Sequence, residues 1–188
     1  MRHAQNMLVA FGANLKTGDM SLAATITAAA QALTTPDVTL VTMSRLYASP
    51  CFPPGAGPDY VNAAALLRTS LSPDVLLAHL HRIEAGFRRE RLQRWGQRTL
   101  DLDLLAADEL VWPDAATQSH WRALPASDQS RLSPPELILP HPRLQDRAFV
   151  LVPLADVAPD WRHPVLGLTV TQMLARLDPT DIRAVTAL

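Results

Sequence analysis

The chain has 188 residues, of which 48% are hydrophobic and 19% charged, and its formal net charge is −1. This length suits one globular domain, and the near-neutral charge gives no support to a nucleic-acid partner. No apolar run approaches the length of a transmembrane helix, and the first residues lack the apolar stretch of a signal peptide. Cys51 is the only cysteine, so no internal disulfide can form and we expect a cytoplasmic protein.

Short hydrophobic runs and repeats with helical spacing alternate through the first half of the chain. A run ended by Gly12 predicts a buried strand, and apolar residues spaced three or four apart from Leu22 to Leu33 predict a helix. Asp19 or Ser21 can cap that helix, because both side chains accept hydrogen bonds from a first turn. The strands predicted in this half are 7–11, 38–47 and 60–68, and the helices are 22–33 and one that begins at Ser72-Pro73.

A further predicted strand, residues 99–106, alternates between leucine and polar residues. Alternation directs the leucines toward a core and places Asp101 and Asp103 on the opposite face, about 7 Å apart. Two carboxylates at this distance repel each other, and a divalent cation removes the repulsion. Mg²⁺ suits such a pair, because it takes one or two carboxylates and fills its other positions with water and phosphate. An exposed strand face paired with nearby arginines is the simpler alternative.

The second half of the chain has a less regular pattern. Residues 109–112 can return as a hairpin partner of the preceding strand. Residues 113–135 show no clean period and exceed an ordinary connection of about 12–15 residues, so we predict a mobile insertion within a single domain spanning 1–188. The other predicted elements are a short strand at 137–139, a helix at 148–158 in which Pro153 is tolerable only near the first turn, and a last helix capped by Thr169.

This order of elements indicates an α+β fold, because hairpin-like neighbours and helices between strand pairs favour an antiparallel sheet over a doubly wound parallel one. The sequence contains neither GxxxxGK[ST] nor GxGxxG, so arginines and a metal have to hold any bound phosphate. The basic stretch before the aspartates can serve this purpose, although a solvated basic loop is the simpler alternative. Its arginines are Arg88, Arg89, Arg91, Arg94 and Arg98.

The stretch Arg94-Trp95-Gly96-Gln97-Arg98-Thr99-Leu100-Asp101-Leu102-Asp103 resembles the signature RWGPRTLDLDLL of the 6-hydroxymethyl-7,8-dihydropterin pyrophosphokinases, a folate-pathway family. Gln97 replaces the proline of that signature, which loosens the turn but removes no chemical group. Arg88 stands where the family usually has glycine. The resemblance covers about 9–159 and breaks in the insertion after Trp112.

Three other segments are similar to the same family. The pattern PHPRxxxRxFVLxPLxEIAP is met between Pro140 and Pro159, with Asp156 at its acidic position. The Tyr-x-Asn-Ala-Ala pattern begins at Tyr60, and Gly-Ala-Asn-Leu begins at Gly12, where the family has serine in place of alanine. That alanine lacks the serine hydroxyl, so any side-chain hydrogen bond from the position is lost.

The resemblance implies a three-layer α/β/α sandwich around a mainly antiparallel sheet with a ferredoxin-like core. It implies transfer of pyrophosphate from ATP to the hydroxymethyl group of the dihydropterin, with two Mg²⁺ ions bridged by Asp101 and Asp103. Arg89 and Arg98 are implied as catalytic residues beside these aspartates. The residues implied for ATP are Glu84, Arg91, Arg98, His141 and Arg147. Those implied for the pterin are Gly12, Asn14, Ser49, Pro50, Cys51, Phe52, Tyr60, Asn62, Trp95 and Phe149.

Asn62 supports a pterin site independently, because asparagine is a poor strand former and a buried carboxamide offers donors and an acceptor to a heterocycle. Phe52 and Phe149 offer flat faces for its ring. A bulge or edge position is the simpler explanation of Asn62. The corresponding simple explanations are a structural or surface side chain for His141 and surface charge at a helix end for Glu84.

Two other functions stay open. A pterin-binding or regulatory module that has lost catalysis is expected to break the metal pair, whereas both aspartates are present. A kinase that transfers one phosphoryl group to another alcohol is opposed only weakly by Asn62. No covalent nucleophile is evident, which fits catalysis by positioning and charge stabilisation. The expected partners are ATP and the dihydropterin, without nucleic acid or membrane, and we expect a monomer.

Overall fold

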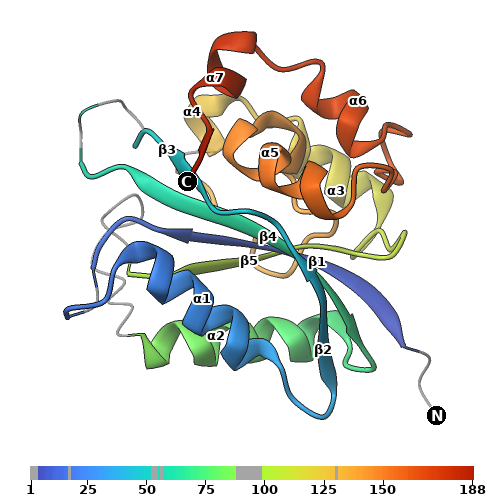
Figure 1. Cartoon of the computed structure of the whole chain (residues 1–188). Coiled ribbons are helices and arrows are strands. Elements are labelled where there is room, and N and C mark those ends of the chain that lie inside the picture. The colour runs from blue at the N-terminus through green and yellow to red at the C-terminus, as the bar shows by residue number, and fades with distance from the viewer. Residues whose placement is uncertain (1–3, 17, 52–54, 56, 88–98, 130) are drawn as a thin grey trace.

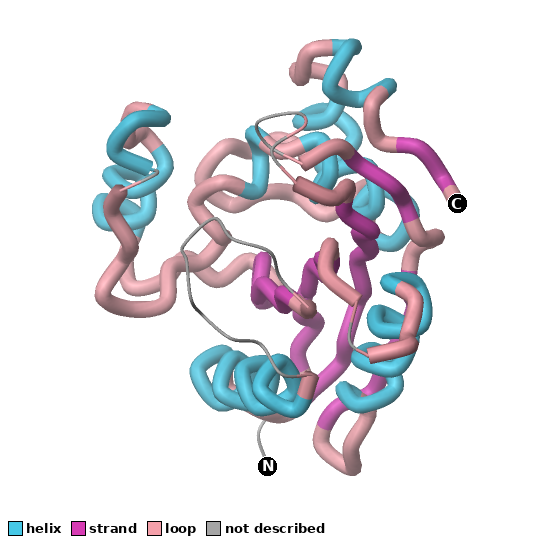
Figure 2. Tube along the Cα trace, turned by 90° about the vertical axis from the view of Figure 1, so that its left-hand side faces the viewer, coloured by secondary structure: helices cyan, strands magenta, loops and turns pink. Residues whose placement is uncertain are grey.

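The computed structural model shows a central sheet with helices on both faces (Figures 1 and 2). It describes residues 4–16, 18–51, 55, 57–87, 99–129 and 131–188. In the described part of the chain the sheet has the order β5-β1-β4-β3-β6, and β2 also pairs with β4. The strands are β1 (Gln5–Ala13), β2 (Val38–Met43), β3 (Tyr47–Ser49), β4 (Tyr60–Thr69), β5 (Asp101–Ala107) and β6 (Thr186–Ala187).

Helices α1 (Leu22–Leu33) and α2 (Pro73–Gly86) cover one face of the sheet, and α5 (Ala148–Val157) covers the other (Figure 1). All strand pairs are antiparallel, and two interleaved βαβ units give the ferredoxin-like arrangement. The predicted three-layer α+β fold is confirmed. The remaining helical elements are α3 (Ala115–Arg122), α4 (Ala126–Gln129), η1 (Leu144–Asp146), α6 (Val170–Leu174) and α7 (Pro179–Arg183). None of the described helices has the length and hydrophobicity needed to span a bilayer.

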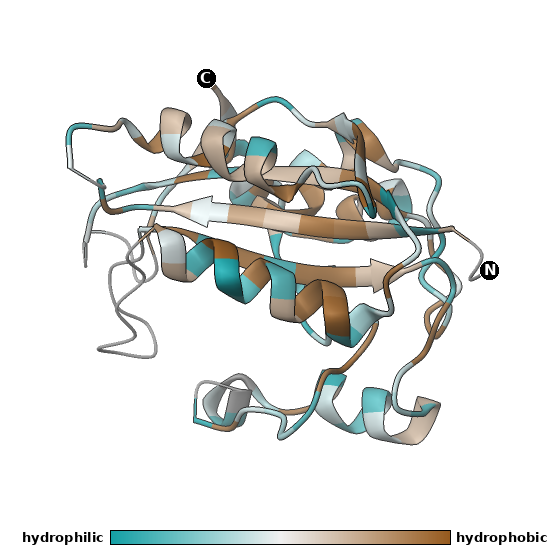
Figure 3. Cartoon of the chain, turned by 90° about the horizontal axis from the view of Figure 1, so that it is seen from below, coloured by the Kyte–Doolittle hydropathy of each residue, from teal (hydrophilic) through white to brown (hydrophobic). Residues whose placement is uncertain are grey.

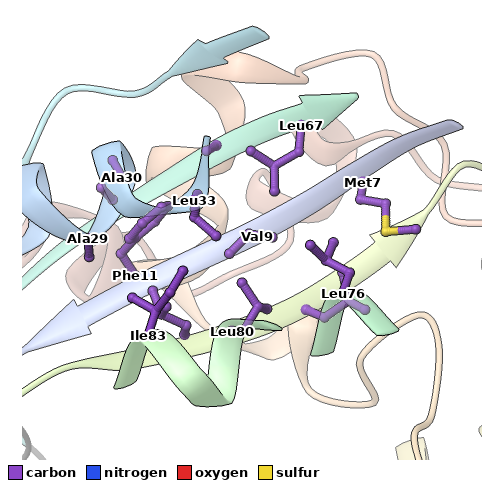
Figure 4. Packing of buried hydrophobic residues seen from close by; sticks show 14 of the residues in the cluster. Met7, Val9, Phe11, Ala29, Ala30, Leu33, Leu67, Leu76, Leu80 and Ile83 are labelled. Atoms are coloured by element: carbon purple, nitrogen blue, oxygen red, sulfur yellow. The ribbon is translucent and has the colours of Figure 1, made fainter. Parts of the chain in front are cut away.

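The central strand β1 is buried on both faces, which explains why its sequence is a continuous hydrophobic run (Figure 3). Its alternate residues Met7, Val9 and Phe11 pack against α1 and α2 (Figure 4). Leu8 and Ala10 face the other way, into a second cluster with residues of α5. The two clusters hold the sheet rigidly between the helical layers, so the polar residues at the strand ends have a fixed support.

The predicted strand 38–47 is in fact two strands, β2 and β3. The break occurs at Ser44, whose side chain takes the place of a backbone acceptor in the pairing with β4. Its Oγ accepts a hydrogen bond from the N–H of Ala64 at 2.9 Å. The next residue, Arg45, turns to α5 and binds both carboxylate oxygens of Asp156, at 3.1 and 3.0 Å. Tyr47 donates to the same carboxylate at 2.8 Å, so this acidic position supports the fold.

The prediction that 109–112 forms a hairpin with the preceding strand is wrong. Trp112 pairs with Leu139, and the two exchange backbone hydrogen bonds of 2.8 and 3.0 Å. One edge of β5 is paired with β1, while the carbonyl of Leu105 accepts from the N–H of His141 at 2.8 Å. The later segment therefore approaches β5, and the predicted strand at 137–139 is reduced to an isolated bridge.

The insertion 113–135 contains α3 and α4, which its lack of a clean period did not indicate. Asp114 caps α3 by accepting from the N–H groups of Ala116 and Thr117, each at 2.9 Å. Gln118 in this helix is fully buried. Each of these two helices has too few turns for a hydrophobic period to be recognised in the sequence. The mobility of the insertion stays a prediction.

The structure also defines two helix caps, the position of Pro153 and a short C-terminal strand. Ser21, whose Oγ accepts from the N–H of Ala24 at 3.2 Å, is the cap of α1. Thr169 caps α6, as predicted, but α6 is not the last helix, because α7 follows it. Pro153 lies in the second turn of α5 and not in the first. Burial of most of α5 against the sheet offsets the cost of that proline. The short strand β6 was not predicted, because it forms only by pairing with β3.

The buried residue His163 makes the stability of the fold depend on pH. Its Nδ1 accepts from the N–H groups of Val165 and Leu166, both at 3.2 Å. Burial, with the nearby charge of Arg122, lowers the pKa of His163 from 6.5 to about 4. The unfolded chain therefore takes up a proton first as the pH falls between these values, and the free energy of unfolding decreases with it.

We expect His163→Asn, which keeps an acceptor for the two amides, to lessen this loss of unfolding free energy between pH 7 and pH 4 by about 2 kcal/mol. Urea denaturation at both pH values measures the difference. The matched control is His120→Asn, the same substitution at an exposed histidine. Equal pH dependence in wild type and His163→Asn would contradict the assignment.

Candidate active site

One row of aligned residues crosses the strands of the sheet. It lies on the same face of the sheet as α5. The register aligns Tyr47 of β3, Asn62 of β4, Gly12 of β1 and Asp101 of β5. Strand spacing of about 4.8 Å places the backbones of Asn62 and Asp101 about 10 Å apart, on either side of Gly12. A side chain at Gly12 would begin 3.6 Å from Oδ1 of Asn62 and 3.9 Å from Cβ of Asp101. Because Gly12 has no side chain, it leaves uncovered the surface between the carboxamide of Asn62 and the carboxylate of Asp101. We call this surface the open floor of the site.

The two aspartates of β5 lie on this same face, as the alternation predicts. Asp103 pairs with Ala10, which belongs to the cluster under α5, whereas Leu102 belongs to the cluster on the opposite face. Both carboxylate residues are half-buried. Among the described residues, no group of three or more His, Cys, Asp or Glu could hold a metal ion. A pair of carboxylates fits Mg²⁺, which takes its remaining ligands from water and phosphate.

Glu84 supports the strand that carries the aspartates. Its side chain is 1% exposed, and Oε1 accepts from the N–H of Leu102, between Asp101 and Asp103, at 2.8 Å. Surface charge at a helix end is therefore excluded as its explanation. Glu84 secures the position of β5 from the side of α2, and its implied contact with ATP stays a prediction.

His141 is held near the aspartates in one tautomer. Its Nδ1 accepts from the N–H of Arg143 at 3.2 Å, so the neutral ring carries its proton on Nε2. Burial, together with the charges of Arg147 and Arg143, lowers the pKa of His141 from 6.5 to about 3, although the charge of Asp101 opposes this shift. The imidazole is therefore neutral at pH 7 and offers an N–H donor, which suits a phosphate or ribose oxygen.

Asn62 is fixed in its orientation by a second polar residue. Its Nδ2 donates to Oγ of Ser49 at 2.8 Å, and both residues are buried. In this orientation Oδ1 is the amide atom that lies near the floor at Gly12. Tyr60 lies beside the same floor, with Cδ1 4.0 Å from the position of a side chain there. The open floor thus meets a hydrogen-bond acceptor and an aromatic edge.

Phe149 adds an aromatic surface at the first turn of α5. Its side chain is 40% exposed, and the guanidinium carbon of Arg147 lies 5.6 Å from the centre of its ring. The contact keeps a cation next to an exposed aromatic face. Such a pair suits a ligand that joins a flat ring to an anionic group.

Other residues implied for the pterin stabilise the loop beyond β3. Asn14 is buried and its Nδ2 donates to the carbonyl of Pro58 at 3.2 Å. Cys51 is also buried, and its Sγ lies 3.1 Å from the carbonyl oxygen of Gly57 and 3.2 Å from its nitrogen. Pro50 is exposed. These contacts hold the loop next to the end of β1, and direct contact with a ligand stays a prediction.

Five implied site residues lie outside the described residues, so their predicted roles have no structural test here. They are Phe52, Arg89, Arg91, Trp95 and Arg98. The structure adds one contact that the sequence did not suggest: Gln118 of α3 donates from Nε2 to the carbonyl of Pro140 at 3.2 Å. No local pattern could indicate it, because the two residues are 22 positions apart.

The sequence profile described as 7,8-dihydro-6-hydroxymethylpterin-pyrophosphokinase (HPPK) matches residues 8–159. The chain belongs to this family. The match includes the aligned row of Gly12, Tyr47, Asn62 and Asp101, and also the segment around His141. The family and its named relatives are described as pyrophosphokinases of hydroxymethyldihydropterin.

Several relatives carry the name 2-amino-4-hydroxy-6-hydroxymethyldihydropteridine pyrophosphokinase. The protein from Synechocystis is 43% identical over 139 residues, which cover 74% of this chain and 60% of that protein. The protein from Pseudomonas aeruginosa is 39% identical over 160 residues, which cover 85% of each. The wild-type HPPK-DHPS crystal structure from Plasmodium falciparum aligns with a TM-score of 0.66 at 12% identity, over 94% of this chain and 45% of that one. This last likeness shows the fold alone.

Proposed function

We propose that this HPPK family member transfers pyrophosphate from ATP to the hydroxymethyl group of 6-hydroxymethyl-7,8-dihydropterin, giving AMP and the pterin diphosphate. The observation that carries the proposal is the row across the sheet, in which Asn62 and the Asp101 carboxylate flank the open floor at Gly12. A pterin held by its polar edge at Asn62 extends its hydroxymethyl group toward the carboxylates. The hydroxyl group that accepts the pyrophosphate then lies next to the proposed phosphate site.

The side chains divide into two groups with different tasks. Asn62, fixed by Ser49, accepts from an N–H of the heterocycle, and Phe149 offers its exposed ring as a stacking face. For the nucleotide, neutral His141 donates from Nε2 to one of its oxygens, and Arg147, which lies next to the Phe149 ring, neutralises phosphate charge. The implied phosphate arginines Arg89, Arg91 and Arg98 and the pterin-side residues Phe52 and Trp95 complete the proposed site.

Mg²⁺ is the metal that we propose for Asp101 and Asp103. When bound, it stabilises the negative charge of the transferring phosphates and of the leaving group. The two carboxylates supply the hard oxygen ligands, and the buried Glu84 holds their strand in place. We propose two ions, because one triphosphate and two carboxylates provide ligands for both.

The nucleotide product tests the reaction. Pyrophosphoryl transfer produces AMP in equal amount to a pterin diphosphate, and we expect AMP formation to require both Mg²⁺ and the pterin. Chromatography of the nucleotides and mass spectrometry of the pterin distinguish the outcomes. ADP with a pterin monophosphate would contradict attack on the β-phosphorus, and a binding module would give neither product while still releasing or absorbing heat on titration with the pterin.

A further inference from the structure

A buried glutamine of the insertion contacts the segment that carries His141. Gln118 of α3 is fully buried and donates from Nε2 to the carbonyl of Pro140 at 3.2 Å. A carbonyl oxygen can only accept, so this contact fixes the orientation of the amide. The side chain thus connects the insertion to the residue immediately before the proposed nucleotide-binding histidine.

This hydrogen bond fixes the orientation of the peptide bond between Pro140 and His141. The carbonyl of Pro140 and the N–H of His141 belong to one rigid peptide unit. Gln118 holds its oxygen, and the carbonyl of Leu105 in β5 holds its N–H at 2.8 Å. With both ends of the plane bonded, rotation of the backbone at His141 is opposed from the side of α3 and from the side of the aspartate strand.

The helix that supplies Gln118 is capped at its start and ends near His163. At its start, Asp114 accepts two backbone hydrogen bonds and one from the hydroxyl of Thr117 at 2.8 Å. At its end, the guanidinium of Arg122 lies near enough to His163 to help burial lower the pKa of that histidine. Gln118 therefore projects from a helix whose first turn is stabilised by its N-cap residue.

We propose that Gln118 is a positioning residue for the nucleotide, acting through His141. The inference rests on the proposed function, since it assigns His141 to ATP. Gln118 belongs to α3, which lies in the segment 113–135 that we predict to be an insertion. The insertion therefore contributes to ATP binding without touching the nucleotide.

A double-mutant cycle tests this role. Gln118→Met keeps the length of the side chain and removes the donor, and we expect it to raise the KM for ATP about tenfold, the effect of losing one buried hydrogen bond. The KM for the pterin and kcat should stay within about twofold, because only the nucleotide side is loosened. Combined with His141→Ala, Gln118→Met should have almost no further effect on the KM for ATP. The matched control is Ala116→Met, at an exposed position of the same helix.

Additive effects of Gln118→Met and His141→Ala would overturn the inference, as would a wild-type KM for ATP in Gln118→Met. If Gln118→Met does not fold, Asp114→Ala takes its place: loss of the α3 cap should raise the KM for ATP severalfold, and only while His141 is present. Additivity there would equally refute the role. Absence of AMP formation by the wild type would instead refute the proposed function, and the inference with it.

Discussion

Asp101→Asn and Asp103→Asn are each expected to lower turnover by a factor on the order of 10² or more, while the thermal midpoint stays close to that of the wild type. Each substitution is nearly isosteric but removes one negative charge from the proposed metal site. Both side chains are half-buried on the ligand face of β5 and lie outside the two hydrophobic clusters. The leucines on the other face of the strand remain in the core.

Steady-state AMP formation and thermal denaturation together measure this result. Asp108→Asn is the matched control, because Asp108 follows the same strand at its opposite end and its Oδ1 only accepts from the N–H of Asn6, at 3.1 Å. Asparagine can accept the same bond, so the control should retain activity. Activity within a few-fold of the wild type in either Asp101→Asn or Asp103→Asn would contradict the metal assignment.

Gly12→Leu is expected to lower kcat/KM for the pterin by about 10², since its side chain would fill the floor between Asn62 and Asp101. Gly12→Ala should cost less than tenfold, because a single Cβ would make only ordinary contacts of 3.6 to 4.0 Å. The backbone of Gly12 is not in the left-handed region, so neither substitution creates strain there.

Calorimetric titration with the pterin and activity assays follow the Gly12 series. The alanine variant serves as the control for altered strand packing, and thermal denaturation verifies that both variants fold. A leucine variant that binds the pterin as tightly as the wild type would show that the ligand does not occupy this floor. The site would then have to lie away from the row formed by Asn62, Gly12 and Asp101.

The sequence by itself determined the features that repeat or match within a short stretch. Alternation from residue 99 predicted which face of β5 carries the aspartates, and the structure confirms it because a pleated strand sends successive side chains to opposite faces. The motif around Asp101 predicted the family, and the order of apolar segments predicted a mainly antiparallel α+β fold. Both depend on local residue patterns, which remain visible without any knowledge of distant contacts.

Only the tertiary structure decided how separate elements meet. Glu84 resembles a surface charge at a helix end until β5 is placed beside α2, where it accepts the N–H of Leu102. Trp112 pairs with Leu139 and not with β5, and Gln118 is buried against Pro140. Such contacts join residues far apart in the chain and follow no period, because they depend on which backbone groups the sheet leaves unpaired. The position of His141 beside Asp101 arises in the same way, from pairing of its backbone with the edge of β5.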